Sequence, residues 1–191
     1  MERSDRSADD RRGAILRATV DLLVEVGLAR ARTRDVTERS GVGTGLLNHY
    51  FRWSDLRATA WGLIFDDVIP RQFGAALSPA DAMDHFFAQN FTPDSEPFWR
   101  LWLEASEMAG QDPAMSAALK SAQARLETAL GDVLRAGCAL GVWTLPEPGD
   151  TALRLIALHD GLAALLMTAS TSLDAASAER HMRRAFALEC A

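Results

Sequence analysis

Side chains able to hydrogen bond to nucleic acid gather in the segment GVGTGLLNHYFR, which ends at Arg52. Thr44, Asn48 and His49 recur at helical spacing within it. Asparagine can bond to an adenine edge, threonine to a base or a phosphate, and arginine to a phosphate. Leu46 could contact a thymine methyl group. These residue types predict a nucleic-acid contact if one exposed helix presents them together.

Two short helices joined by a glycine-bearing turn are expected to carry these side chains. Thr33 is a suitable N-cap for the first helix, and Gly41 is a suitable residue to end it. Either Gly43 or Thr44 would cap the second helix. This is the layout of a helix-turn-helix, in which the second helix enters the major groove of DNA. An ordinary helical hairpin with its aromatic residues in the core is the alternative.

The expected DNA-contacting residues lie at the start of the first short helix and along the second. They are Thr33, Arg34, Thr44, Gly45, Leu46, Asn48, His49, Tyr50 and Arg52. The amides at the start of the first helix could hold a phosphate. The distribution of charge agrees, because residues 1–60 carry 11 arginines against 9 acidic residues. The net charge of −6 therefore comes from residues 61–191.

The remaining chain shows helical periodicity and almost no strand signal, which predicts an all-α fold of about nine helices. A first helix is expected from about Asp10 to near Gly27. A fourth should start at Ser54 or Asp55 and kink or end at Pro70. Three pairs of a capping residue and a proline should begin further helices: Ser78–Pro79, Thr92–Pro93 and Asp112–Pro113.

The C-terminal part is predicted to hold three longer helices. The first runs from Asp112 to about Gly141, and residues 142–150 form a loop after it. A very apolar helix is expected over residues 151–168, and Asp174 should cap the last one. No apolar run is long enough to suggest a membrane span, so no membrane partner is expected.

Recognised catalytic and metal-binding patterns are absent from the sequence. It shows no nucleophile elbow, metal-ligand cluster, phosphate loop or pair of catalytic carboxylates. We therefore expect no enzyme activity, no cofactor and no metal. Cys138 and Cys190 match no metal spacing and are expected to be thiols in a cytoplasmic protein.

The segment GVGTGLLNHYF, with VGL and TRDV before it, resembles TetR-type bacterial transcriptional regulators over residues 10–60. That resemblance implies a DNA-binding domain over residues 1–53 and a ligand-binding and dimerisation domain over residues 54–191. Gly43 stands where the family usually has serine, and Asn48 where it often has tyrosine. The segments FWRLWLEASEMAGQDPAM and IALHDGLAALLM resemble the BetI-type branch, which includes choline-responsive repressors. The resemblance implies a ligand-responsive dimeric regulator, most often a repressor, bound to a pseudo-palindromic operator.

Large aromatic residues recur at helical spacing in the second domain, where they could line an effector pocket. The expected lining is Trp61, Phe65, Trp99, Trp102, Glu104 and Met167. Aromatic faces with a carboxylate suit a small organic cation. An aromatic metabolite fits the tryptophan content nearly as well, and simple core packing is the alternative for these residues.

The last two helices are too apolar to be fully solvated, which predicts a four-helix interface in a two-fold homodimer. The expected interface residues are Leu155, Leu158, His159, Leu162, Leu165, Met182 and Phe186. His159 is otherwise explained as a satisfied core histidine.

A second function keeps the same fold but has lost DNA binding. This hypothesis is motivated by three residues that differ from the family pattern: Gly43, Asn48 and Trp53. Such a protein would carry or scaffold a lipid-like or apolar small molecule. The retained outward set of Thr44, Asn48, His49 and Arg52 favours the regulator.

Overall fold

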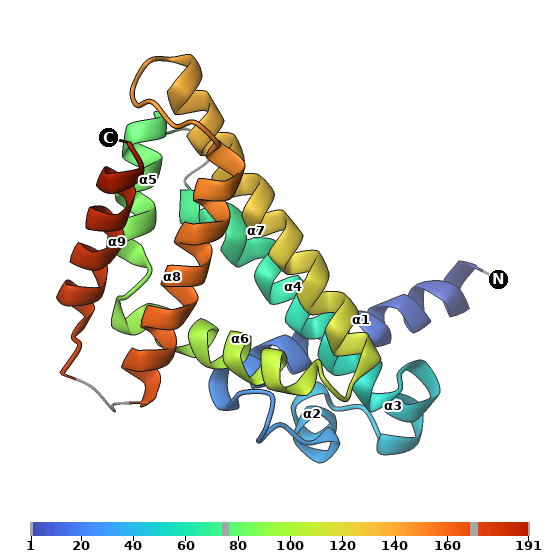
Figure 1. The fold of residues 1–191 in the computed structure, drawn as a ribbon. Coiled ribbons are helices and arrows are strands. Elements are labelled where there is room, and N and C mark those ends of the chain that lie inside the picture. The colour runs from blue at the N-terminus through green and yellow to red at the C-terminus, as the bar shows by residue number, and fades with distance from the viewer. Residues whose placement is uncertain (1, 74–76, 169–171, 191) are drawn as a thin grey trace. The chain divides into compact units, whose positions relative to one another are not determined.

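The computed structural model describes residues 2–73, 77–168 and 172–190 (Figure 1). Within these ranges the chain is all-α, with nine α-helices, one short 3-10 helix and no strand. The elements are α1 (Glu2–Val26), α2 (Thr33–Ser40), α3 (Thr44–Tyr50), α4 (Trp53–Phe73), α5 (Pro79–Gln89), η1 (Pro93–Ser95), α6 (Glu96–Met108), α7 (Pro113–Ala139), α8 (Pro148–Thr168) and α9 (Ala175–Glu189). The predicted fold class is confirmed.

The N-terminal helices differ from the expectation mainly at their first residues. Thr33 is the first helical residue of α2 rather than its cap, because Arg32 holds the extended cap conformation without a side-chain bond. Gly41 ends α2 as predicted, with φ 70° in the left-handed region. Of the two candidates for the cap of α3, Gly43 is the one observed. Pro70 does not end α4, which continues to Phe73, although proline cannot donate the hydrogen bond to the carbonyl four residues before it.

Three of the expected helix starts have their capping side chains in place. Ser78 Oγ accepts from the Asp81 amide at 3.2 Å, and Asp174 Oδ1 accepts from the Ser177 amide at 2.7 Å. Asp112 Oδ1 accepts from the amides of residues 114 and 115 at the start of α7. The Thr92–Pro93 prediction was wrong for an α-helix, because these residues begin the 3-10 helix η1. The apolar helix α8 starts at Pro148, inside the expected loop.

Contacts divide the chain into two compact units. Unit 1 comprises Met1–Phe65 with Arg100–Ser121, and unit 2 comprises Asp66–Trp99 with Ala122–Ala191. The end of α6 and the start of α7 therefore pack with the N-terminal helices. The expected domain boundary after residue 53 stays a prediction, and the contact-based division lies elsewhere.

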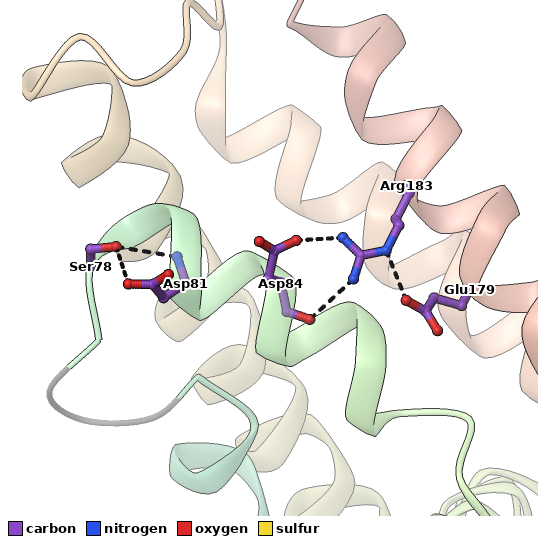
Figure 2. Close-up of polar contacts among 5 residues, drawn as sticks. All are labelled: Ser78, Asp81, Asp84, Glu179 and Arg183. Atoms are coloured by element: carbon purple, nitrogen blue, oxygen red, sulfur yellow. Dashed lines mark hydrogen bonds and ion pairs between the residues drawn. The ribbon is translucent and has the colours of Figure 1, made fainter.

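In unit 2, α8 and α9 lie side by side, and α5 packs against α9 (Figure 1). Figure 2 shows the polar link between α5 and α9. Arg183 bonds to the carboxylate of Asp84 and, through Nε at 2.8 Å, to Glu179. The same guanidinium lies 5.2 Å from the ring centroid of Phe87. These contacts fix α9 against α5 over a buried aromatic side chain.

Three tryptophan indoles are tied to the main chain. Trp61 Nε1 donates to the Leu101 carbonyl at 3.0 Å within unit 1. In unit 2, Trp99 donates to the Asn90 carbonyl at 2.7 Å. Trp143 Nε1 donates at 2.9 Å to the carbonyl of residue 134, one turn before Gly137. Each large ring is therefore held in one orientation by a polar contact as well as by packing.

Helix α8 is long and apolar enough to cross a membrane by length and composition alone, with a mean hydropathy of 1.3 over its best 18-residue window. Core helices of soluble proteins meet the same criterion. Its buried face includes Leu155, Ile156, His159 and Leu162. That face lies within unit 2, which explains much of the apolar composition.

Candidate nucleic-acid interface and sensing residues

The two short helices present the expected polar side chains outward from a buried seam. Val36 of α2 and Leu47 of α3 are fully buried and join the helices to the core of unit 1. Thr44, Asn48 and His49 are exposed on α3. This alternation follows from the 3.6-residue period, which turns one side of a seven-residue helix inward and the other toward solvent.

Among the predicted residues, Gly45, Arg34 and Arg52 are also exposed, whereas Thr33, Leu46 and Tyr50 are half-buried. An open cleft of about 420 Å³ lies beside the end of α3. Its lining comprises Arg12, Asn48, His49, Tyr50, Phe51, Arg52, Asp55 and Thr59. The cleft thus brings together four of the predicted residues.

Arg12 was missed by sequence reasoning. Its guanidinium carbon lies 5.3 Å from the ring centroid of Phe51, so it joins the cleft from α1. Arg12 stands in a strongly charged N-terminal stretch, and this was the signal in the sequence that could have identified it as a contact residue. A guanidinium stacked on an aromatic ring keeps its outer N–H groups free for an anion such as a phosphate.

Arg34 has a partner in the free protein. Its Nε bonds to Glu38 Oε1 at 2.7 Å, and this hydrogen bond raises the pKa of Arg34 above its usual value. Both side chains are largely exposed, so the ion pair is weak, and a phosphate can replace Glu38 as the partner of Arg34.

The residues of the expected effector pocket are distributed over both units. Trp61, Phe65 and Trp102 form one packed cluster in unit 1, with ring centroids 4.4 to 5.6 Å apart. Trp61 is fully buried. Packing of this kind agrees with the simpler alternative, in which these rings fill the core.

Glu104 was expected to face the effector, but its carboxylate has other partners. Oε2 accepts hydrogen bonds from the amides of Leu28 and Ala29, which follow α1. A side chain that completes a backbone turn is not available to balance a ligand cation, so the structure assigns Glu104 to the N-terminal helices. Sequence reasoning missed this contact because its partners are 75 and 76 residues away.

In unit 2, His159 of α8 is enclosed by aromatic rings. The centroid of Trp99 lies 4.2 Å from that of the imidazole, and those of Phe86 and Phe91 lie at 5.3 and 5.5 Å. His159 is 1% exposed, and its Nδ1 lies 3.5 Å from Asp160 Oδ1. Burial lowers the pKa of His159, and the nearby carboxylate of Asp160 opposes this lowering only in part. Met167, the other expected pocket residue in unit 2, is half-buried near the end of α8.

Replacing His159 with phenylalanine should remove part of the pH dependence of stability. The lowered pKa means that the folded protein keeps a neutral imidazole, while the unfolded chain takes up a proton below pH 6.5. The stabilisation of the folded protein by the neutral imidazole is therefore complete above that pH, and it is lost as the pH falls toward the folded-state pKa. Urea unfolding of both proteins between pH 8 and pH 5 measures it. H181F, which alters an exposed histidine, should keep the wild-type dependence. Parallel curves for wild type and H159F would contradict the prediction.

The expected dimer residues split into two groups. Leu155, His159 and Met182 are at most 1% exposed, and Leu162 is 7% exposed, so unit 2 itself covers them. The periodic stripe that they form faces the protomer's own core, and their role in a subunit interface stays a prediction. The outer face of α8 instead carries Leu153, 52% exposed, and the predicted Leu165, 42% exposed. Leu158 and Phe186 are half-buried.

The described residues form an all-α protein with an N-terminal helix-turn-helix and a helical C-terminal body. Two family models match the chain: the bacterial regulatory proteins of the tetR family over residues 15–53, and the C-terminal domain of BetI-type transcriptional repressors over residues 79–191. The chain therefore belongs to the TetR family, with a BetI-type C-terminal domain.

Individual relatives agree with this assignment. The HTH-type transcriptional regulator BetI of Burkholderia lata is 29% identical over 161 residues, covering 80% of this chain and 79% of that protein. A TetR transcription regulator of Haloarcula marismortui superposes with a TM-score of 0.75 at 19% identity, covering 95% of this chain and 97% of the other. A protein of Saccharomonospora viridis, described as a transcriptional regulator and solved with choline, gives 0.76 at 19% identity, covering 92% and 94%. The two structural likenesses show the shared fold.

Proposed function

We propose that the protein is a dimeric, ligand-released repressor that binds a pseudo-palindromic operator. The observation that carries the proposal is the exposed polar face of α3. Asn48, His49 and Arg52 line one cleft with Arg12 of α1. A base-reading amide beside two guanidinium groups has the composition of a major-groove contact with flanking phosphate contacts. The BetI-type repressor match over the body supports repression as the direction of control.

Selection of bound duplexes from a random library tests operator binding. The wild type should enrich a sequence with two-fold symmetry, and its affinity should fall steeply with salt. N48A should relax the preference at one base pair, by about 1–3 kcal/mol. R12A and R52A should weaken binding to all sequences, and each should reduce the salt slope by about one. R180A, an exposed arginine of α9, is the matched control. Failure of the wild type to enrich any duplex would overturn the proposal and favour a carrier function.

Removing the partner of Arg34 should strengthen DNA binding. In E38Q the guanidinium loses its ionised neighbour, so it no longer has to exchange one anion for another when it meets a phosphate. We expect affinity for any duplex to rise several-fold at low salt and the gain to shrink as salt increases. Fluorescence anisotropy at two salt concentrations measures this. E107Q makes the same change at an exposed position of α6 and should have little effect.

We infer that the effector is a small organic cation or an aromatic metabolite. The aromatic residues of the body support both classes, and the choline complex of the Saccharomonospora viridis protein makes choline the first compound to test. A 100-fold release from the operator requires the effector to favour the released form by about 2.7 kcal/mol. Titrating choline and an aromatic acid against the operator complex separates the two classes. An effector should lower operator affinity, and it should bind less tightly once operator is bound.

A further inference from the structure

The C-terminal end of α1 is completed by side chains from α6. Of its last four carbonyl groups, that of Leu23 accepts from the Gly27 amide at 2.8 Å. The carbonyls of Val24 and Glu25 accept from Nη2 of Arg100, at 3.1 and 3.3 Å. The carbonyl of residue 26 accepts from the nearby Arg30 side chain at 2.9 Å. Helix ends leave such carbonyls without intrahelical partners, so α6 supplies two of the four partners required.

The amides that follow α1 are also bonded to α6. Glu104 Oε2 accepts from Leu28 at 2.5 Å and from Ala29 at 3.3 Å. Arg100 and Glu104 are four residues apart, so they lie on the same face of α6. The cation therefore meets the negative end of the α1 dipole, and the carboxylate meets the free amides beyond it. We call Arg100 and Glu104 the α6 clamp.

Gly27 is required by this clamp in two ways. Its φ is +83°, a conformation that side chains disfavour. A Cβ atom there would also lie 2.7 Å from Oε2 of Glu104 and 3.2 Å from Nε of Arg100. Gly41, at the end of α2, shares the positive φ but has nothing within 4 Å of an added Cβ. Substituting Gly41 therefore introduces backbone strain alone, whereas substituting Gly27 introduces the same strain together with loss of the α6 clamp.

We propose that Arg100 and Glu104 are positioning residues for operator binding, which hold the α1–α2 turn against α6 and thereby keep the recognition helix at the placement that an operator with two half-sites requires. This inference rests on the proposed DNA-binding function. Residues 27–32 connect α1 directly to α2, and Leu28 is fully buried, so the clamp sets where α2 begins. Helix α2 packs against both α1 and α3, which passes that placement to the recognition helix.

The experiment compares the affinity for the full selected operator with that for a duplex carrying one half-site. Binding to a half-site needs one folded N-terminal region, whereas the full site needs two at a fixed spacing. E104A and R100M should lower full-site affinity at least tenfold and change half-site affinity less than twofold. E107A, on the same helix, is the matched control and should behave as wild type. Hydrogen exchange at the amides of Leu28 and Ala29 should accelerate in E104A alone.

The glycine pair gives a second measurement. G27A should reproduce the selective full-site loss of E104A, whereas G41A should lower full-site and half-site binding alike. Equal losses at both sites in E104A would mean that the clamp only stabilises the fold, and would overturn the proposal. Unchanged full-site binding would also overturn it. If the wild type selects no duplex, the proposed DNA-binding function is refuted, and the positioning role is refuted with it.

Discussion

Replacing Gly137 with alanine is expected to destabilise the protein by about 1–3 kcal/mol, the usual cost of forcing atoms into a packed region. A Cβ atom at this position would lie 2.0 Å from Cζ2 of Trp143. The indole cannot withdraw freely, because its Nε1 donates to Leu134 and its ring packs edge-on against Phe186 at 5.2 Å. Either α7 shifts, or Trp143 leaves its site and loses both contacts.

Urea unfolding followed by circular dichroism measures the cost for Gly137. The control is G131A on the same helix, where an added Cβ would meet only the flexible end of Arg135. Because glycine is a poor helix former, G131A should be neutral or stabilising by up to about 1 kcal/mol. The two variants therefore make the same chemical change with opposite expected signs. Equal midpoints for G137A and G131A would contradict the prediction.

Placing charge on the outer face of α8 is expected to dissociate the proposed dimer and to lower operator affinity more than 100-fold, roughly the loss of one of two half-site contacts. Leu153 and Leu165 are 52% and 42% exposed, and Ala157 and Gly161 lie exposed between them. Small residues in the middle of an apolar stripe allow a second helix to approach closely, and glutamates there would be buried without partners.

Sedimentation of the L153E/L165E variant at micromolar concentration, together with operator titration, tests the dimer face. L63E is the matched control, since Leu63 is 45% exposed but belongs to α4 in unit 1. We expect L63E to sediment with the wild type and the double variant to sediment as a monomer with unchanged helicity. A double variant that remains dimeric would place the interface elsewhere.

The fold could be predicted where local chemistry decides the structure. Ser78 and Asp174 cap helices through bonds to amides three residues away, so their signal is contained in a short segment. The helix-turn-helix was predictable for the same reason, since Gly41 and the alternation around Leu47 are local. Thr92 shows the limit of such signals, because its Pro93 started a 3-10 turn and α6 began only at Glu96.

The candidate sites were less predictable where distant contacts decide the role of a residue. Periodicity showed that Leu155 and Met182 lie on apolar faces, but it could not tell the protomer core from a subunit interface. Glu104 was placed near a ligand because its helix is aromatic, whereas two amides at the end of α1 bind it. Arg12 was missed because its partner Phe51 is brought to it by tertiary packing.

The tryptophans whose indoles are bonded to main-chain carbonyls also serve as intrinsic fluorescence probes. Trp61 is fully buried in unit 1 and Trp143 is half-buried in unit 2, and each indole donates to a carbonyl, so their emission should report unfolding of each unit separately. Trp53 is half-buried directly after the recognition helix, with the Arg57 guanidinium 5.5 Å from its ring centroid. Single-tryptophan variants that keep Trp53 or Trp99 should therefore resolve in time whether the N-terminal helices or the body responds first when effector meets the operator complex.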